Sequence, residues 1–435
     1  MKLKPYPSYK DSRVAWLGDV PENWGTHRLR WMFQRKKETN RPDAELLSVY
    51  RDYGVIPKSS RDDNFNKPSD DLSAYQFVER GDLVLNKMKT WQGSIAISDH
   101  EGIVSPAYYV AKPLLQMNLK FMHYLLRSPV YISQYNLLSA GIRPNQWDLD
   151  FDDFRDLLAL LPSKEEQPVI ATFLDRETTK LDTLISKQEK LIELLQEKRQ
   201  AVISHAVTKG LDPDAPMKDS GVEWLGEVPK GWNACRFSRA ILAIKDGTHG
   251  TFSRVDEGKL LLSAKNVNNG IIEISDDESL ITIEDHESIV YNGFPKKGDL
   301  LLTIVGTIGR SCVYQLDDSI SFQRSVCFIR LKKSCLPQFF YYFTQSKFYQ
   351  EQLHSKSKSS AQAGVYMGDV VATSVVYPID YKEQSAITTF LDRETNKIET
   401  LIEKAKRSIE LAKEHRTALI SAAVTGKIDV REYSC

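Results

Sequence analysis

The chain has 435 residues, of which 41% are hydrophobic and 10% aromatic, enough for about three domains with cores of their own. This composition excludes a chain that is disordered as a whole. Lysine plus arginine and aspartate plus glutamate both total 58, so the net charge is zero. A histone-like protein that holds a polyanion by its overall field is therefore excluded, and any polyanion must bind to local patches.

Cysteine usage and hydropathy indicate a cytoplasmic protein with no membrane partner. The five cysteines, at positions 235, 312, 327, 335 and 435, form no CxxC pair, so neither a zinc ribbon nor a disulfide framework is favoured. Residues 1–13 lack an apolar core of signal-peptide length, and the Leu-rich run 157–161 is too short to span a bilayer.

The first motif of the chain returns in its second half. Residues 11–24, DSRVAWLGDVPENW, recur 208 positions later as DSGVEWLGEVPKGW, and nine of the fourteen positions are identical. We expect the repeated tryptophans, Trp16 with Trp24 and Trp224 with Trp232, to pack a domain edge. A duplicated chain predicts two similar halves related by an approximate two-fold axis.

The segment after the first motif alternates short apolar runs with glycines, which predicts strands followed by helices. The expected strands are residues 46–50, 82–86, 94–98 and 108–111, and the expected helices are 119–127 and 130–138. Gly81-Asp82 is interpreted as a hairpin turn.

A long amphipathic helix is predicted from Lys164 to about Val207, because apolar residues recur at three- and four-residue spacing and Gly210 follows. Leu184 and Leu191 are among the residues of this stripe. From residue 178 to 206 the helix would run about 43 Å, somewhat more than the roughly 34–36 Å of one DNA turn. An ordinary coiled-coil core also explains the stripe.

The second half repeats this order. Strand-like runs at 260–264, 298–302, 312–314 and 326–331 precede an aromatic helix at 338–343, and Gly298-Asp299 lies 217 positions after Gly81-Asp82. The stripe from Ile398 to Ala423, which includes Leu401, then predicts a second long helix that pairs antiparallel with the first. The predicted fold is α+β, with two α/β domains joined by two long antiparallel coiled-coil helices.

The block FLDRET stands before both helical stripes, at 173–178 and 390–395. Two interpretations stay open: a cap at the start of a helix, or a surface on which another protein docks. The docking interpretation involves eight side chains of the two blocks: Phe173, Asp175, Arg176, Glu177, Phe390, Asp392, Arg393 and Glu394.

Polar and basic side chains between the strands are candidates for contacts with DNA, because Arg and Lys bond guanine edges, Asn and Gln pair with adenine, and phosphates accept from all of them. A solvated surface residue is the alternative for each one. In the first half the candidates are Arg51, Lys58, Lys87, Lys89, Trp91, Gln92, Arg143 and Asn145. In the second half they are Lys245, Thr248, His249, Lys265, Asn266, Thr307, Arg310, Gln323, Arg324, Lys356 and Lys358.

No catalytic or metal site is indicated by the sequence. Ser105-Pro-Ala-Tyr108 resembles the base-holding motif of methyltransferases, but Ala107 replaces its second proline and no glycine-rich cofactor loop accompanies it. The phosphate-binding motif of a motor ATPase is absent, and the histidines are isolated.

The duplicated tryptophan motif and the duplicated block Glu-Gln…Phe-Leu-Asp-Arg-Glu-Thr…Ala-Val-Thr resemble those of the specificity subunits of type I restriction-modification systems. The resemblance covers nearly the whole chain. It implies target-recognition domains at 1–161 and 211–377, and conserved spacer helices at 162–210 and 378–435. Each recognition domain is then expected to read one half of a split, asymmetric DNA site, and the helices to set the gap.

The same resemblance implies the partners. Two adenine methyltransferase subunits would dock on the helices and motor-nuclease subunits would add to them, so that S-adenosylmethionine, ATP and Mg²⁺ serve the complex while this chain binds no cofactor and is not itself an enzyme. Two alternatives remain open: a coiled-coil scaffold that does not bind DNA, and a self-contained methyltransferase or nuclease.

Overall fold

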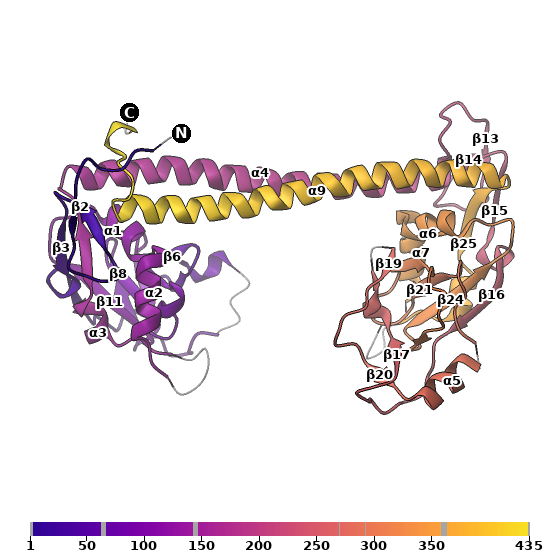
Figure 1. The fold of residues 1–435 in the computed structure, drawn as a ribbon, viewed down its shortest axis with the longest axis horizontal. Coiled ribbons are helices and arrows are strands. Elements are labelled where there is room, and N and C mark those ends of the chain that lie inside the picture. Colours follow the sequence, from indigo (N-terminus) through magenta and orange to yellow (C-terminus); the bar gives the residue numbers. More distant parts are fainter. Residues whose placement is uncertain are drawn as a thin grey trace. The chain divides into compact units, whose positions relative to one another are not determined.

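The computed structural model describes residues 3–61, 67–141, 147–268, 270–291, 293–357 and 363–433. The chain forms two compact units: unit 1 comprises Met1–Glu189 and Arg407–Cys435, and unit 2 comprises Lys190–Lys406. Each unit combines one strand-rich segment with parts of both long helices (Figure 1). The units therefore cut across the two helical segments that the sequence analysis set apart as separate domains.

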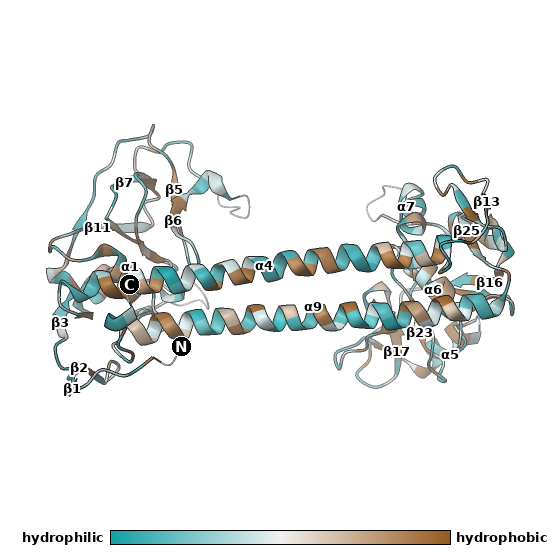
Figure 2. Ribbon diagram, turned by 90° about the horizontal axis from the view of Figure 1, so that it is seen from above, coloured by the Kyte–Doolittle hydropathy of each residue, from teal (hydrophilic) through white to brown (hydrophobic). Residues whose placement is uncertain are grey.

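The two long helices are α4 (Glu166–Lys209) and α9 (Tyr381–Val424), each of 44 residues. Unit 1 contains the start of α4 and the end of α9, and unit 2 contains the end of α4 and the start of α9, so the helices lie antiparallel (Figures 1 and 2). In unit 1 the Arg416 Nε atom is 3.0 Å from the Asp182 carboxylate across the pair. The predicted antiparallel helices are confirmed.

The apolar stripe of the helices is narrower than predicted. The small residues Ala405 and Ala412 are buried, but Leu184, Leu191 and Leu401, which the spacing assigned to the stripe, are exposed. Two helices cover only a narrow seam between them, and positions beside that seam stay in solvent. Figure 2 shows the corresponding alternation of hydrophilic and hydrophobic residues along both helices.

Unit 1 is built on a four-stranded antiparallel sheet in the order β4-β11-β8-β9. Its strands are β4 (Phe33–Lys36), β11 (Tyr108–Pro113), β8 (Leu83–Asn86) and β9 (Ile95–Ile97). Four antiparallel ladders flank it: β1 (Tyr9–Asp11) with β2 (Asp19–Pro21), β3 (Gly25–Arg28) with β12 (Leu158–Leu161), β5 (Leu47–Tyr50) with β6 (Gly54–Pro57), and β7 (Gln76–Val78) with β10 (Gly102–Val104). The helices are α1 (Leu119–Leu126), α2 (Pro129–Leu138) and α3 (Phe151–Asp156).

The pleat of β8 divides unit 1 into two cores, because successive side chains of a strand point to opposite faces. Leu83 and Leu85 belong to the large core, which contains α1, α2 and the buried residues of α4 and α9. Val84 belongs to a smaller core on the other face, together with Val49 of β5 and Val55 of β6. The β5–β6 hairpin is therefore held against the sheet on the face away from the helices.

Unit 2 repeats the sheet in the order β16-β24-β21-β22. These strands are β16 (Ile241–Asp246), β24 (Val326–Leu331), β21 (Leu300–Thr303) and β22 (Ser311–Val313). The remaining strands are β13 (Met217–Asp219), β14 (Glu227–Pro229), β15 (Trp232–Arg236), β17 (Lys259–Leu262), β18 (Val267–Asn268), β19 (Ile271–Ile272), β20 (Leu280–Ile281), β23 (Ser321–Phe322) and β25 (Ser374–Pro378). The helices are α5 (Ile283–Tyr291), α6 (Pro337–Gln345), α7 (Lys347–Ser355) and α8 (Met367–Val371). The matching sheets confirm that both segments are α+β variants of one fold.

Two local expectations were wrong. Gly81-Asp82 forms a tight turn, but β7 before it pairs with β10 and β8 after it pairs with β9 and β11, so the turn closes no hairpin. Trp224 is 63% exposed, whereas its counterpart Trp16 packs edge-on against Tyr131 with ring centres 5.1 Å apart.

Candidate nucleic-acid interface

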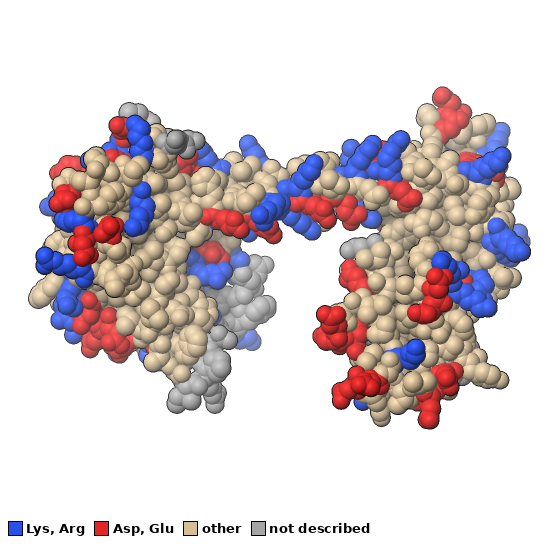
Figure 3. All heavy atoms as spheres, viewed as in Figure 1, with Lys and Arg blue, Asp and Glu red and all other residues tan. Residues whose placement is uncertain are grey.

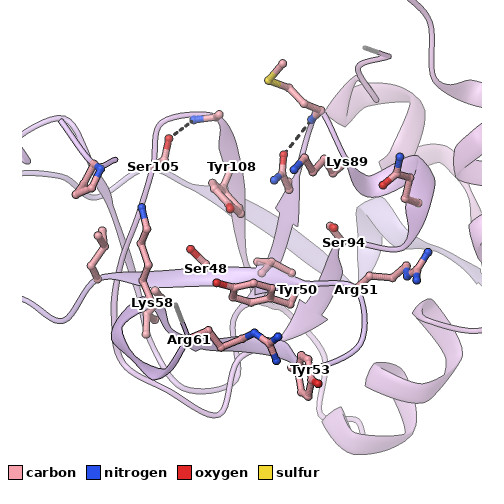
Figure 4. Close-up of a pocket in the computed structure, with 18 of the residues that line it drawn as sticks. Ser48, Tyr50, Arg51, Tyr53, Lys58, Arg61, Lys89, Ser94, Ser105 and Tyr108 are labelled. Atoms are coloured by element: carbon pink, nitrogen blue, oxygen red, sulfur yellow. Dashed lines mark hydrogen bonds between the residues drawn. The ribbon is translucent and has the colours of Figure 1, made fainter. Parts of the chain in front are cut away.

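A cavity lies in unit 1, between the β5–β6 hairpin and the adjoining ends of β8, β9 and β11. Its volume is about 1250 Å³, and Arg51, Lys58, Lys89 and Gln92, four of the predicted DNA contacts, line it. Figure 4 shows Lys58 and Ser105 on one side of this cavity, Arg51, Lys89 and Ser94 on the other, and Ser48, Tyr50 and Tyr108 between them. The structure thus brings together residues that lie up to 41 positions apart in the chain.

The turn of the hairpin positions Arg51 within the unit 1 cavity. Gly54, which ends the turn, has φ +75°, a conformation that favours glycine, and a Cβ atom there would lie only 3.3 Å from the Ala96 side chain. Arg127 lies at the C-terminal end of α1. Its guanidinium donates to the Arg51 carbonyl oxygen and, at 2.9 Å, to the Ile95 carbonyl oxygen. These two bonds fasten the turn to β9.

Aromatic side chains line the unit 1 cavity beside the cations, and the sequence analysis missed them. The Arg61 guanidinium lies over the Tyr53 ring, with Cζ 4.5 Å from the ring centre, and 5.6 Å from the centre of the Tyr50 ring. Tyr50 and Tyr53 pack edge-on at 6.5 Å. The alternation of aromatic and charged residues in Tyr50-Arg51-Asp52-Tyr53 was the signal that could have found them.

Positive charge dominates the lining of the unit 1 cavity. Among the described residues five basic side chains line it, Arg51, Lys58, Arg61, Lys67 and Lys89, against the single carboxylate of Asp52. That carboxylate is 3.5 Å from the Arg51 Nε atom. Burial raises the pKa of the Tyr108 hydroxyl above its ordinary value, so this group adds no negative charge to the lining at neutral pH. The cavity therefore presents cations and hydrogen-bond donors to a ligand.

The other predicted contacts of the first half lie outside this lining. The Trp91 ring packs at 4.8 Å against Trp147, and its Nε1 donates to the Met88 carbonyl oxygen at 3.1 Å. The Lys87 Nζ atom is 5.9 Å from the centre of the Tyr109 ring. Arg143 and Asn145 lie outside the described residues.

A smaller pocket of about 240 Å³ in unit 2 is lined by Lys245, Thr248 and His249 together with phenylalanines such as Phe252 and Phe322. The His249 Nε2 atom is 2.7 Å from the Asp246 carboxylate, which orients the imidazole ring at the pocket.

Two further predicted residues adjoin Thr248. The Arg324 backbone N–H donates to the Thr248 carbonyl oxygen at 3.0 Å, and Gln323 forms a β-bridge with Thr248. Arg324 is exposed and Gln323 half-buried. Unit 2 therefore brings five of the predicted residues to one place: Lys245, Thr248, His249, Gln323 and Arg324.

Asn266 corrects a prediction. It is 2% exposed, its side-chain oxygen accepts from the Ser263 N–H, and its amide nitrogen donates to the Glu273 carbonyl oxygen and to Glu278. These bonds stabilise its own loop and leave no free amide edge for a base. The neighbouring Lys265 is exposed and forms a 3.0 Å ion pair with Glu278.

The remaining predicted residues of the second half are spread over two places. Thr307 and Arg310 are exposed in the connection between β21 and β22, where the Arg310 N–H donates to the Thr303 hydroxyl at 2.9 Å. Lys356 caps the end of α7, and Lys358 lies outside the described residues.

The FLDRET blocks lie inside α4 and α9, not at a helix junction, so the cap interpretation was wrong. Asp175 accepts from the Tyr124 hydroxyl at 2.9 Å, and Asp392 accepts from the Tyr342 hydroxyl at 2.6 Å. Phe173 is 1% exposed within the unit 1 core, so its ring presents no surface for docking. These residues join each helix to the sheet-bearing part of its own unit.

The other half of each FLDRET block is only partly exposed: Arg176, Glu177 and Glu394 are half-buried, and Arg393 is exposed. Glu177 bonds Arg176 and Lys180, and Glu394 bonds Arg393 and Lys397, all at 2.9–3.0 Å. Arg393 also lies over the half-buried ring of Phe390, with Cζ 5.6 Å from its centre. A docking role therefore stays a prediction for these partly exposed ion pairs and for Phe390.

One segment of unit 2 is strongly acidic. Residues 273–287 of unit 2 include seven Asp or Glu and no Lys or Arg. Figure 3 shows acidic side chains gathered on this part of unit 2, and acidic and basic side chains intermingled along α4 and α9. In the described part of the chain, no group of three or more His, Cys, Asp or Glu is arranged to hold a metal ion. Within the same residues, no helix has the length and apolar character required to cross a bilayer.

Two α+β units with one sheet order and unlike loops, each packed on parts of both long helices, define a protein with an internal structural repeat. Residues 252–411 match the family model of the type I restriction modification DNA specificity domain. The type I restriction enzyme EcoBI specificity subunit of Escherichia coli is 26% identical over 270 residues, or 60% of this chain and 56% of that protein. The EcoKI specificity subunit of E. coli K12 is 21% identical over 323 residues, 71% of this chain and 65% of that protein. The matches thus span less than two thirds of either relative.

Solved structures share the fold. A chain from a structure of the type I R-M system, concerned with its complex assembly and conformational transition, has a TM-score of 0.70 at 14% identity, covering 93% of this chain and 98% of that chain. The HsdS subunit of Thermoanaerobacter tengcongensis has a TM-score of 0.53 at 16% identity, covering 94% and 98%. These structures confirm the predicted fold, and the family-model and sequence matches confirm the resemblance to type I specificity subunits.

Proposed function

We propose that this chain is the DNA-recognition subunit of a cytoplasmic type I restriction-modification complex. Unit 1 reads one half of a split, asymmetric site and unit 2 reads the other half. The observation that carries this proposal is the pairing of one sheet order with unlike loops, because loops held on a common scaffold change specificity without changing geometry.

In this proposal α4 and α9 set the gap between the half-sites and dock two methyltransferase subunits, for which the partly exposed ion pairs of the FLDRET blocks are candidate contacts. The complex methylates adenine at N6 and, with motor-nuclease subunits added, cleaves unmodified DNA. S-adenosylmethionine, ATP and Mg²⁺ are used by those subunits, and this chain contributes recognition without catalysis.

The unit 1 cavity supports the recognition role by its charge. Five cations against one carboxylate suit phosphates, and Gln92 and the hydroxyls add donors and acceptors for base edges. Because the chain as a whole has no net charge, such local patches must supply the attraction to DNA.

The test is single-molecule methylome sequencing of cells that express this chain with a cognate methyltransferase subunit. We expect N6-methyladenine in a split motif that disappears when the chain is omitted. A chain with Arg51 and Lys89 replaced by alanine should lose methylation of that motif, whereas replacing Lys190 and Lys198, exposed on α4, should not alter the bases read. Absence of chain-dependent methylation beside an active methyltransferase would overturn the proposal and favour a scaffold that does not bind DNA.

A further inference from the structure

The shape of the unit 1 cavity, in addition to its charge, indicates which kind of ligand it can receive. Its volume of about 1250 Å³ is above the roughly 300–1,000 Å³ of ordinary small-molecule sites. The hydroxyl-bearing side chains of Ser48 and Ser94 line it although both are buried, so they lie behind the charged rim. A ligand must project into the protein to reach them.

The groups that project outward from an intact duplex are its sugars and phosphates, not its bases. Proteins read the edges of paired bases by inserting side chains, helices or strands into a groove, because the edges lie inside the outline of the duplex. At a hollow protein surface the ligand must enter the protein instead. Its inner polar groups are within reach of a base only when that base has left the stack and turned outward.

The lining of the unit 1 cavity matches an unstacked nucleotide in chemistry. Tyr53 keeps 59% of its surface exposed while Arg61 lies over its ring, so an aromatic face and a planar cation stand together at the rim. Bases stack on such rings, and cations beside them hold the phosphate. Lys58 and Lys89 line the same cavity on opposite sides (Figure 4).

We propose that the unit 1 cavity receives one unstacked nucleotide of the bound DNA, whose base stacks on Tyr53 and whose phosphate is held by Lys58, Arg61 and Lys89. This inference rests on the proposed function and deepens it. The half-site of unit 1 is then read partly from an extruded base, whereas the 240 Å³ pocket of unit 2 has fewer cations and a lining richer in phenylalanine.

The test uses the full chain bound to its methyltransferase subunit and duplexes that contain the methylated split site. A mismatch is introduced at each position of the two half-sites in turn, and binding is measured by fluorescence anisotropy. At one position of the unit 1 half-site, other than the adenine that is methylated, we expect the mismatch to tighten binding about tenfold, because an unpaired base is extruded at lower cost.

Two substitutions separate stacking from folding. Tyr53→Ala should abolish the tightening at that position and weaken binding to the matched duplex about tenfold, while Tyr53→Phe keeps the ring and should keep both properties. Tyr291→Ala is the matched control, because Tyr291 is an exposed ring of unit 2 far from this lining in sequence. Thermal melting of each variant checks that the units remain folded.

The outcomes distinguish the two proposals. If mismatches weaken binding at every position except the methylated adenine, or if the tightening survives Tyr53→Ala, the cavity does not hold an extruded nucleotide although split-site methylation persists. If no chain-dependent split-site methylation exists, the proposed function fails and this inference fails with it.

Discussion

Unit 1 and unit 2 each contain a four-stranded sheet of the same order. They differ in the residue that bonds the glutamate near the start of the long helix in each unit. In unit 1 the Tyr6 hydroxyl donates to Glu166 of α4 at 2.6 Å, and in unit 2 the Trp232 indole N–H donates to the equivalent Glu383 of α9 at 2.8 Å. The helix side chain is retained while its partner changes. The repeat therefore keeps the glutamate of the helix, and each unit supplies a different side chain to donate to it.

The Gly-Asp turns follow the same rule. Asp82 accepts from the Glu79 N–H and pairs with Lys36 of β4, whereas Asp299 accepts from the Lys296 N–H and forms a two-bonded pair with Arg330 of β24 at 2.7 and 2.9 Å. The aspartate is constant and the cation comes from different strands. A short motif thus fixes the start of β8 and of β21 while the strands around it vary.

The largest expected difference between the units is the stability lost when a core residue of the helix after the sheet is replaced by alanine. Phe340 of α6 packs on Phe237 and Tyr377 with ring centres 5.6 and 5.2 Å away, and the corresponding position in α1 is Met122. Phe340→Ala should destabilise its unit by about 3–5 kcal/mol, more than Met122→Ala, because ring contacts are lost in addition to buried area. Urea unfolding of both variants measures this, with the exposed Leu137→Ala as control. An equal or larger loss for Met122→Ala would contradict the aromatic contribution.

The next largest expected difference concerns two buried glutamines, Gln167 in the first turn of α4 and Gln384 in the first turn of α9. Gln384 accepts from the Leu336 N–H and donates to the carbonyl oxygens of Ser334 and Pro378, whereas Gln167 bonds only Asn118 and Pro162 in the described part of unit 1. Gln384→Ala should cost about 3 kcal/mol and Gln167→Ala about 2 kcal/mol, because buried backbone groups lose their partners.

Differential scanning calorimetry of the two glutamine variants measures this ranking. Gln196→Ala, on an exposed position of α4, should shift the melting temperature of neither unit. A reversed order would show that the extra bond of Gln384 contributes nothing to stability.

A pH dependence should follow in unit 1 from His123, at a position where unit 2 has no histidine. Burial, and then the charge of Arg127, lower the pKa of His123 to about 3, while α6 has Tyr341 at this position. Because the folded-state pKa is depressed, the stabilisation is present above about pH 6.5 and is lost as pH falls toward 3.

Between pH 6.5 and 5 the wild type should lose about 1–2 kcal/mol relative to His123→Phe. Melting temperatures of both proteins across this range measure the difference, and His354→Phe, an exposed histidine of unit 2, is the control. Parallel melting curves for wild type and His123→Phe would disprove the assignment.

The smallest expected effect is at the Gly-Asp turns. Gly81 and Gly298 both have φ +92°, so alanine at either should cost about 1–2 kcal/mol. Gly81→Ala should cost slightly more, because its Cβ would lie 3.0 Å from Leu119 whereas Gly298 faces open space. Chemical denaturation beside Gly368→Ala, which has neither constraint, tests the order, and equal costs would exclude a contribution from Leu119.

The repeat, the two long helices and the equivalent sheets could be predicted because each is encoded by local periodicity or by direct self-similarity. The unit 1 cavity could not, since Tyr53, Arg61 and Lys89 meet only when the β5–β6 hairpin packs on the sheet. Asn266 was misassigned for the same reason: its partners Glu273 and Glu278 become neighbours through loop folding. The FLDRET block was ambiguous because Asp175 bonds a tyrosine 51 positions away.

The two units differ in continuity along the chain, which gives them different schedules during synthesis. Unit 2 is one uninterrupted stretch, Lys190–Lys406, whereas the core of unit 1 requires Leu419, Ala423 and Val424 of α9. Unit 1 begins to be translated first but can finish folding only after residues 407–435 of α9 and the C-terminus are made. Unit 2 can fold before that, because all of its residues precede position 407. On ribosomes stalled after residue 406 has emerged, unit 2 should resist protease and unit 1 should be degraded.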